Sequence, residues 1–161
     1  YDKPLTKTLF AQLNFDIADN GDFYVSFEAD SLMYRYDLDY NQLVCFGFAG
    51  RDMDLNYLRW DSYDQPWKER LAERMSRGFY NAVEYVDETG LLFRSYRKGG
   101  GSVTDGLQVY RDGVLVGDVD VPLGFRMAGY VAPYYYSYVV PDEEGERLYM
   151  FRFKWPSAPE E

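Results

Sequence analysis

Two aspartates in the segment VGDVDVP, Asp118 and Asp120, are the first residues whose spacing suggests chemistry. They lie two positions apart, so on a β-strand both carboxylates point to the same face. Such a pair could bind a metal ion or flank a glycosidic bond, which requires two acids roughly 5 to 9 Å apart. Asp37 and Asp39 have the same spacing. Solvent-facing strand positions explain both pairs equally well, and we assign neither pair a catalytic role.

The chain contains no histidine. This excludes Ser-His-Asp and Cys-His nucleophile pairs, zinc bound through histidine, and the most common general base in enzymes. The acidic segment DIADNGD, which begins at Asp16, lacks the spacing and the bidentate glutamate of a calcium loop, and a hairpin turn explains it better. The glycines after Lys98 lack a phosphate-binding pattern. The sequence therefore predicts no catalytic residue, no metal site and no cofactor.

Aromatic residues are the best candidates for a binding surface. Exposed tyrosines stack on sugar rings or anchor protein interfaces, because the ring is flat and amphipathic. The segment PYYYSYVV carries one candidate set, Tyr134, Tyr135, Tyr136 and Tyr138. Alternation places Tyr134, Tyr136 and Tyr138 on one strand face, where packing between sheets is the competing explanation. A second candidate set lies in the segment between the first two groups of strands and comprises Trp60, Tyr63 and Trp67.

The composition is that of a single folded domain. Of 161 residues, 47% are apolar and 19% aromatic, enough to form a substantial core. The net charge of −10 argues against a nucleic-acid partner, because phosphate binding needs clustered lysine and arginine. The chain has one cysteine, Cys45, and its apolar neighbours predict a small buried core residue.

Strand patterns dominate the chain. Four short runs with period-two alternation, NFDIAD, DFYVSFEA, LMYRYDLD and QLVCFGFAG, are separated by turn residues, of which Asn20-Gly21 is the strongest hairpin signal. We expect them to form one antiparallel meander sheet, with Phe23, Val25 and Phe27 on its buried face. After residue 78 the runs resume as FYNAVEYVD, LLFRSYRK, LQVYRD and VLVGDVDVP, then FRMAGYVA, YYYSYVV and RLYMFRFKW.

The segment DQPWKERLAERMSRGF predicts one short surface helix near residues 65–77. Asp64 is placed to cap it, Pro66 lies in its first turn, and Gly78 follows its last basic residue. Trp67, Leu71 and Met75 form a narrow apolar stripe, which we expect to pack against a sheet. We expect the charged residues of this segment to face solvent.

The strands fall into three groups of the size of propeller blades, at about residues 10–50, 79–122 and 123–155, with a helical insertion at 51–78. This predicts an all-β fold of four-stranded antiparallel meander sheets, a partial β-propeller of about 2.5 to 3 blades in one domain. An arc of blades leaves open sheet faces and strand edges, so we expect a preceding half of the propeller or a protein partner to cover them. A compact β-sandwich is the alternative.

The run from residue 79 to residue 155 resembles the C-terminal end of the TolB-like six-bladed β-propeller proteins of gut Bacteroidetes. The elements GDVDVP, PYYYS and RLYMFRFK carry the likeness, and the earlier segment YRYDLDYNQLVCFGFAG is similar to a preceding blade of that family. The resemblance implies a location in the cell envelope, secreted or lipid-anchored at the outer membrane. It also implies an association with nutrient-uptake proteins of the SusC/SusD type, and it supplies no catalytic residue.

We therefore expect a non-enzymatic binding or scaffolding module. Its partners would be the missing half of the propeller or another protein, with SusC/SusD-like outer-membrane proteins among them, and its ligand a glycan or a peptide. The alternative is a glycan-binding or glycan-active propeller protein that uses Asp118 and Asp120 together with the tyrosines from Tyr134 to Tyr138. A purely structural subunit is the third reading.

Overall fold

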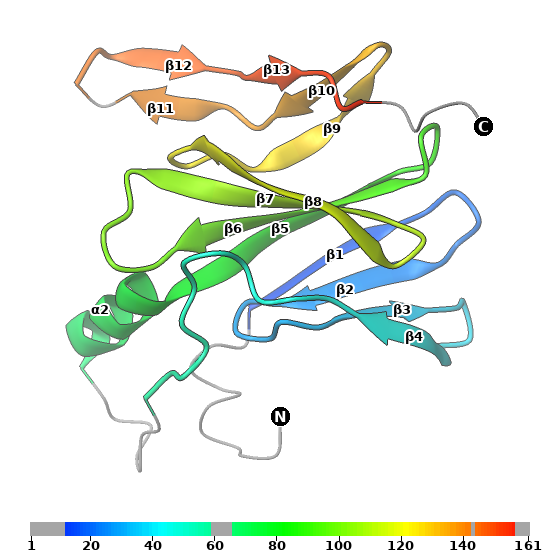
Figure 1. Ribbon diagram of the computed structural model, residues 1–161, viewed down its shortest axis with the longest axis horizontal. Coiled ribbons are helices and arrows are strands. Elements are labelled where there is room, and N and C mark those ends of the chain that lie inside the picture. The colour runs from blue at the N-terminus through cyan, green and yellow to red at the C-terminus, as the bar shows by residue number, and fades with distance from the viewer. Residues whose placement is uncertain (1–11, 59–65, 143, 157–161) are drawn as a thin grey trace.

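In the computed structural model, which describes residues 12–58, 66–142 and 144–156, three antiparallel β-sheets lie one above another (Figure 1). The first sheet spans residues 13–46, the second 78–122 and the third 127–153. The described part of the chain contains one helix, α2 (Trp67–Arg77), which lies beside the start of the second sheet. The all-β fold of propeller-like meander sheets predicted from the sequence is confirmed.

The first sheet is a simple meander. Its strands, in spatial and chain order, are β1 (Leu13–Ile17), β2 (Phe23–Phe27), β3 (Met33–Tyr36) and β4 (Gln42–Phe46). The predicted hairpin at Asn20-Gly21 joins β1 to β2, and Gly21 has a φ of 87°, which other residues adopt only with strain. Asp22 at this turn accepts hydrogen bonds from Arg35 Nε (2.8 Å) and Asn20 Nδ2 (3.0 Å), so its carboxylate serves the turn itself.

The second sheet is the longest and lies in the middle. Its strands are β5 (Gly78–Val86), β6 (Leu91–Lys98), β7 (Thr104–Arg111) and β8 (Val114–Pro122), again in meander order. The dipeptide Asp112-Gly113 joins β7 to β8 with a positive φ at both residues, 51° and 78°, as a tight hairpin of this kind requires.

The third sheet contains β9 (Met127–Val131), β10 (Tyr134–Ser137) and β13 (Arg152–Phe153), in the order β13-β10-β9. A separate hairpin of β11 (Val140–Asp142) and β12 (Arg147–Tyr149) extends from it. This sheet therefore has three strands, with β13 and β9 at its edges, whereas each of the other two has four.

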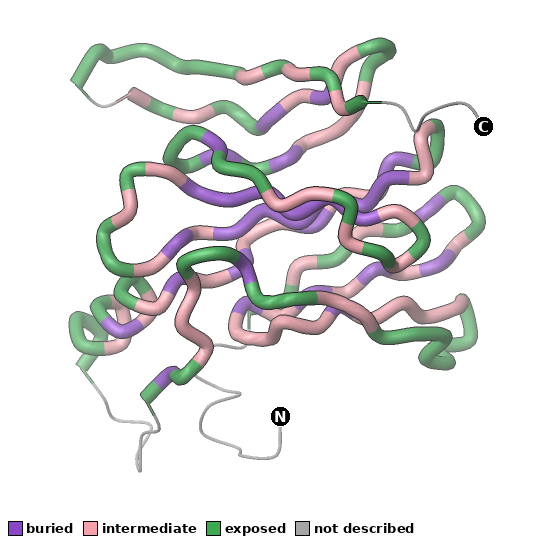
Figure 2. Tube along the Cα trace, viewed as in Figure 1, coloured by how far each residue is buried: buried purple, intermediate pink, exposed green. Residues whose placement is uncertain are grey.

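The sheets meet face to face, and their first strands lie next to one another: β1 contacts β5, and β5 contacts β9. Between the first and second sheets, Tyr24 stacks on Tyr85 with ring centroids 4.6 Å apart. Between the second and third sheets, the rings of Phe93 and Tyr135 lie 4.9 Å apart. Buried residues therefore gather on both sides of the middle sheet (Figure 2).

A fully buried arginine also joins the first two sheets. Arg94 on β6 donates from Nε to Ser26 Oγ (2.8 Å) and from a terminal nitrogen to the carbonyl of Ser31 (2.7 Å). Its other terminal nitrogen donates to the carbonyl of Asp30, and the guanidinium carbon lies 3.2 Å from the centre of the Tyr80 ring. The planar group thus serves several acceptors in the β2–β3 turn, which a lysine could not do.

The prediction for the buried face of the first sheet was wrong. Tyr24, Ser26 and Met33 face the second sheet and are buried, whereas Phe23, Val25 and Phe27 point away from it and are only half-buried. The prediction for Cys45 was wrong for the same reason: it pairs with Tyr34 on the outward side of the edge strand β4 and is exposed. Both faces of this sheet carry aromatic residues, so alternation did not show which face is covered.

The helix was predicted in the right place but with the wrong face inward. Trp67 is 63% exposed and Met75 is exposed, while Glu73 is buried. Glu73 Oε1 accepts the Leu58 backbone N–H (2.6 Å) and Arg77 Nε (3.1 Å), and Arg77 also pairs with Asp54. Charged residues therefore form the packing face of α2, contrary to expectation. Gly78 ends the helix as predicted, and Asp64 lies outside the described residues.

Candidate functional site

All three sheets contribute to an open groove of about 280 Å³ beside their first strands. It combines apolar, amide, aromatic and cationic side chains: Asn14, Phe15, Asn81, Val83, Arg126 and Tyr138. Strand β1 supplies the first two, β5 the next two, and the segments that flank β9 and β10 the last two. A concave surface with a few convergent polar groups on a rigid scaffold is typical of a small-molecule site.

A β-bulge lies at Asn81, one of the residues that line this groove. In the pairing of β5 with β6, Tyr80 opposes Tyr96 and Ala82 opposes Ser95, which leaves Asn81 without a partner residue. Bulges redirect side chains and are common next to functional sites. The side-chain oxygen of Asn81 is buried and accepts no hydrogen bond from any described residue. It is therefore a buried acceptor without a partner among the described residues, and it belongs to a residue that lines the groove.

Arg126 and Tyr138 form the cationic and aromatic side of the groove. The backbone N–H of Tyr138 donates to the carbonyl of Arg126 (2.8 Å), which holds the two segments together. The Arg126 guanidinium carbon lies 5.2 Å from the centre of the Tyr138 ring, a cation–π arrangement. The Tyr138 ring is 50% exposed, and among the described residues Arg126 has no carboxylate within ion-pair distance. Both groups can meet a ligand.

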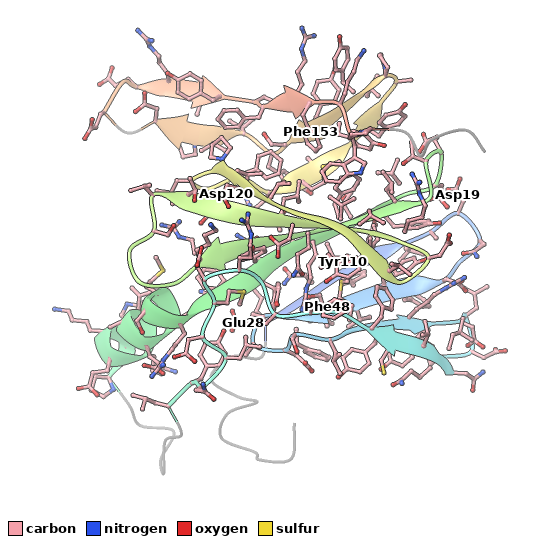
Figure 3. All side chains as sticks on the ribbon, viewed as in Figure 1. Asp19, Glu28, Phe48, Tyr110, Asp120 and Phe153 are labelled. Atoms are coloured by element: carbon pink, nitrogen blue, oxygen red, sulfur yellow. The ribbon has the colours of Figure 1, made fainter. Side chains whose placement is uncertain are left out.

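The carboxylates of Asp118 and Asp120 are already paired within the protein. Asp118 accepts from Tyr96 Oη (2.6 Å), and Asp120 accepts from Lys98 Nζ (2.9 Å) and from Arg51 (2.6 Å). The Lys98 hydrogen bond lowers the pKa of Asp120 below its usual value. A general acid for glycoside hydrolysis needs a raised pKa, so Asp120 does not fit that role. These pairs fasten the segment around Arg51 to the second sheet. Asp120 is labelled on that sheet in Figure 3.

The four candidate tyrosines divide between two environments. Tyr135 is buried against Phe93 and Phe153, in the core between the second and third sheets. Tyr134 and Tyr136 are half-buried on the opposite face of β10, which points away from the second sheet. Arg152 and Lys154 lie over the Tyr134 ring, at 4.7 and 5.1 Å from its centre. Of the four, only Tyr138 lines the groove.

The second candidate set is described only in part. Trp67 is exposed at the first residue of α2, away from the groove. Trp60 and Tyr63 lie outside the described residues. In the part of the chain that the structure describes, no group of three or more carboxylate or thiol side chains is arranged to hold a metal ion. Within the same residues, no helix has the length and apolar character needed to cross a lipid bilayer.

Sequence reasoning identified one groove residue and missed the others. Tyr138 belonged to a conspicuous aromatic cluster, whereas Asn14, Asn81 and Arg126 are single polar residues in ordinary strand or turn contexts. The run FYNAVEYVD gives no sign of a bulge at Asn81, because the bulge is a property of the pairing between two strands. No protein-family model matches the chain, and a comparison with curated proteins gives no match either.

Proposed function

We propose that this chain is a non-catalytic binding and scaffolding module of the β-propeller type, which stacks its first sheet on a β-sheet of another protein surface. The observation that carries the proposal is the apolar face of the first sheet that points away from the second. This outer face comprises Leu13, Phe15, Ile17, Phe23, Val25, Phe27, Tyr34, Tyr36 and Cys45. Its β1 residues are exposed, Phe15 to 58%.

The outer face has the character of a sheet interface. Phe27 and Tyr34 meet edge to face at 6.1 Å, and Tyr40 stacks on Phe23 at 5.6 Å, so aromatic rings form a continuous surface. The two interfaces inside the molecule are also formed by aromatic rings from facing sheets. An exposed apolar surface of this kind marks an interaction site. A third stacking interface of the same type would cover it.

The charges around the outer face indicate the chemistry of the partner. Asp30 accepts the Tyr34 hydroxyl (2.9 Å), and Asp37 and Asp39 lie in the β3–β4 turn, so the rim is acidic. The complementary surface is a tyrosine-rich sheet with basic residues. The third sheet of this chain has that composition on its own outward face, where Arg152 and Lys154 lie over Tyr134. A second copy and a separate propeller half both fit this description.

Cys45 provides the test, because it is the chain's one cysteine and lies on the outer face. A photocrosslinker attached to Cys45 should join the chain to a β-strand of a single protein, identified by mass spectrometry, in an extract of the producing cells. Val25→Asp, in the middle of the face, should abolish that crosslink. The control is Cys45→Ser with Val114→Cys, which moves the label to an exposed position on β8. Crosslinks that persist in Val25→Asp, or that equal those of the control, would overturn the proposal.

We further propose that the chain belongs with the TolB-like propellers and works in the bacterial cell envelope, secreted or lipid-anchored at the outer membrane. The resemblance of GDVDVP, PYYYS and RLYMFRFK supports both statements, and the stacked meander sheets agree with the first. The same resemblance supports membership of a larger SusC/SusD-type uptake complex. Fractionation of producing cells tests the location, and recovery of the chain in the cytosol would contradict it.

A further inference from the structure

We propose that the groove formed by Asn81, Arg126 and Tyr138 binds a saccharide that carries a carboxylate, such as a uronic acid unit. The proposal adds a small-molecule site to the scaffolding function proposed above, and the groove adjoins the outer face at Leu13 and Phe15. The first argument is its placement. Three sheets converge on one hollow, and Asn81, which lines it, lies in a β-bulge that costs strand pairing.

The acceptor on Asn81 defines one part of the ligand. A buried polar oxygen without a hydrogen bond destabilises a protein by about 1 to 3 kcal/mol relative to a satisfied one. The Asn81 side-chain oxygen is such an atom. Asn14, the other amide in the groove, already donates from its side chain to the carbonyl of Tyr80 (3.4 Å). The ligand should therefore present a donor such as a sugar hydroxyl. It reaches the Asn81 oxygen once the side chain rotates toward the groove, because the oxygen itself is buried.

The aromatic and cationic side of the groove defines the other features of the ligand, a flat apolar face and a negative charge. The half-exposed ring of Tyr138 offers a flat surface on which the C–H face of a sugar can stack. Beside it, the Arg126 guanidinium is available, and this group binds carboxylates through two parallel hydrogen bonds. A hydroxyl donor, a flat apolar face and a carboxylate occur together in a uronic acid.

The local charge supports an anionic ligand even though the chain as a whole carries −10. None of the residues that line the groove is acidic, and Arg126 is the charged residue among them. Repulsion from distant carboxylates is screened beyond roughly 8 Å at physiological salt. The groove, at about 280 Å³, lies just below the roughly 300 to 1,000 Å³ range of small-molecule sites, which suits one or two sugar units.

The test compares digalacturonic acid with its methyl ester, which keeps both rings and removes the negative charge. Isothermal titration calorimetry should show binding of the acid that is at least about tenfold tighter than binding of the ester. Arg126→Gln should remove that difference, and Tyr138→Ala should weaken both ligands. Arg152→Gln is the matched control, because Arg152 also lies over a tyrosine of the third sheet but outside the groove. It should bind both ligands as the unmodified chain does.

Amide NMR spectra of the same samples locate the ligand and show that each variant is folded. Shifts should concentrate at Asn81, Arg126 and Tyr138. Equal affinity for the acid and the ester, equal effects of Arg126→Gln and Arg152→Gln, or shifts centred elsewhere would each overturn the proposal. Absence of binding by either saccharide at millimolar concentration would overturn it too. Because Cys45 crosslinking does not depend on the saccharide, failure here leaves the scaffolding proposal to its own test.

Discussion

Glu84 shows how the meeting of three sheets changes the chemistry of one residue. It lies on β5, between the first strands of the neighbouring sheets, and burial together with the negative charge of Asp16 on β1 raises its pKa to about 7. On the other side lies Gly129 of β9, where a Cβ would be 3.5 Å from Glu84 Oε1, in ordinary van der Waals contact with the carboxyl group. A glutamate that titrates near neutral pH makes the stability of the fold depend on pH.

The sign of that dependence follows from the raised pKa. Between pH 4.5 and about 7, the folded chain keeps the Glu84 proton while the unfolded chain has lost it, so stability falls as pH rises through this window. We expect Glu84→Gln to be more stable than the unmodified chain at pH 8, by about 1 kcal/mol after allowance for the half-exposed position, and equally stable at pH 5. Urea unfolding at the two pH values measures this.

The control for Glu84 is Glu88→Gln, at an exposed position in the β5–β6 turn. It should change stability by the same small amount at both pH values. If Glu84→Gln also gave the same change at pH 5 and pH 8, the raised pKa of Glu84 would be contradicted.

The individual elements were largely predictable, because their ends depend on local backbone chemistry. Asn20-Gly21 and Asp112-Gly113 specify hairpins through positive φ, and Gly78 specifies the end of α2. The buried face of each strand was not predictable from local backbone chemistry. Phe23, Val25 and Phe27 alternate as a buried face should, yet the covered side of β2 is the one with Tyr24 and Ser26. Which side is covered depends on the neighbouring sheet, and the pattern of one strand does not record it.

The residues of the candidate groove likewise differ in whether the sequence alone could identify them. Tyr138 could be named from the sequence because aromatic residues are conspicuous, although only the structure separates it from the buried Tyr135. Asn81 could not be identified from the sequence, since its role depends on a shift in register between two strands. Arg126 could not either, because its position over Tyr138 requires two turns to meet.

Two substitutions in helix α2 test which of its faces packs against the rest of the protein. Glu73→Ala should lower the free energy of unfolding by about 2 kcal/mol, because it leaves the Leu58 N–H without its acceptor and removes one of the two carboxylates that pair with Arg77. Met75→Ala, on the exposed apolar stripe, should change it by less than about 0.5 kcal/mol. Urea unfolding of both variants tests this, with Glu69→Ala as the control for losing an exposed glutamate. A larger loss for Met75→Ala than for Glu73→Ala would restore the orientation expected from sequence.

Across the whole molecule, burial decreases from the middle sheet outward (Figure 2). Strands β6 and β7 are buried along almost their entire lengths, whereas β4 is exposed at four of its five residues and β12 throughout. The middle sheet shares a core with each neighbour, while each outer sheet has one such contact. Local opening should therefore begin at the outer sheets, where few apolar contacts must be broken.

Hydrogen exchange measures this gradient. In a dilute sample, amides at Phe93 on β6 and Val109 on β7 should exchange only through global unfolding, at least about a thousandfold more slowly than amides in β4 and β12. Equal protection of β4 and β6 would contradict a stability gradient set by burial.

The same measurement tests whether a partner covers the outer face. If a partner sheet stacks on Phe15 and Val25, protection in β1 to β4 should rise toward that of the middle sheet, while the β11–β12 hairpin, which lies on the far side of the molecule, should keep exchanging rapidly (Figure 1).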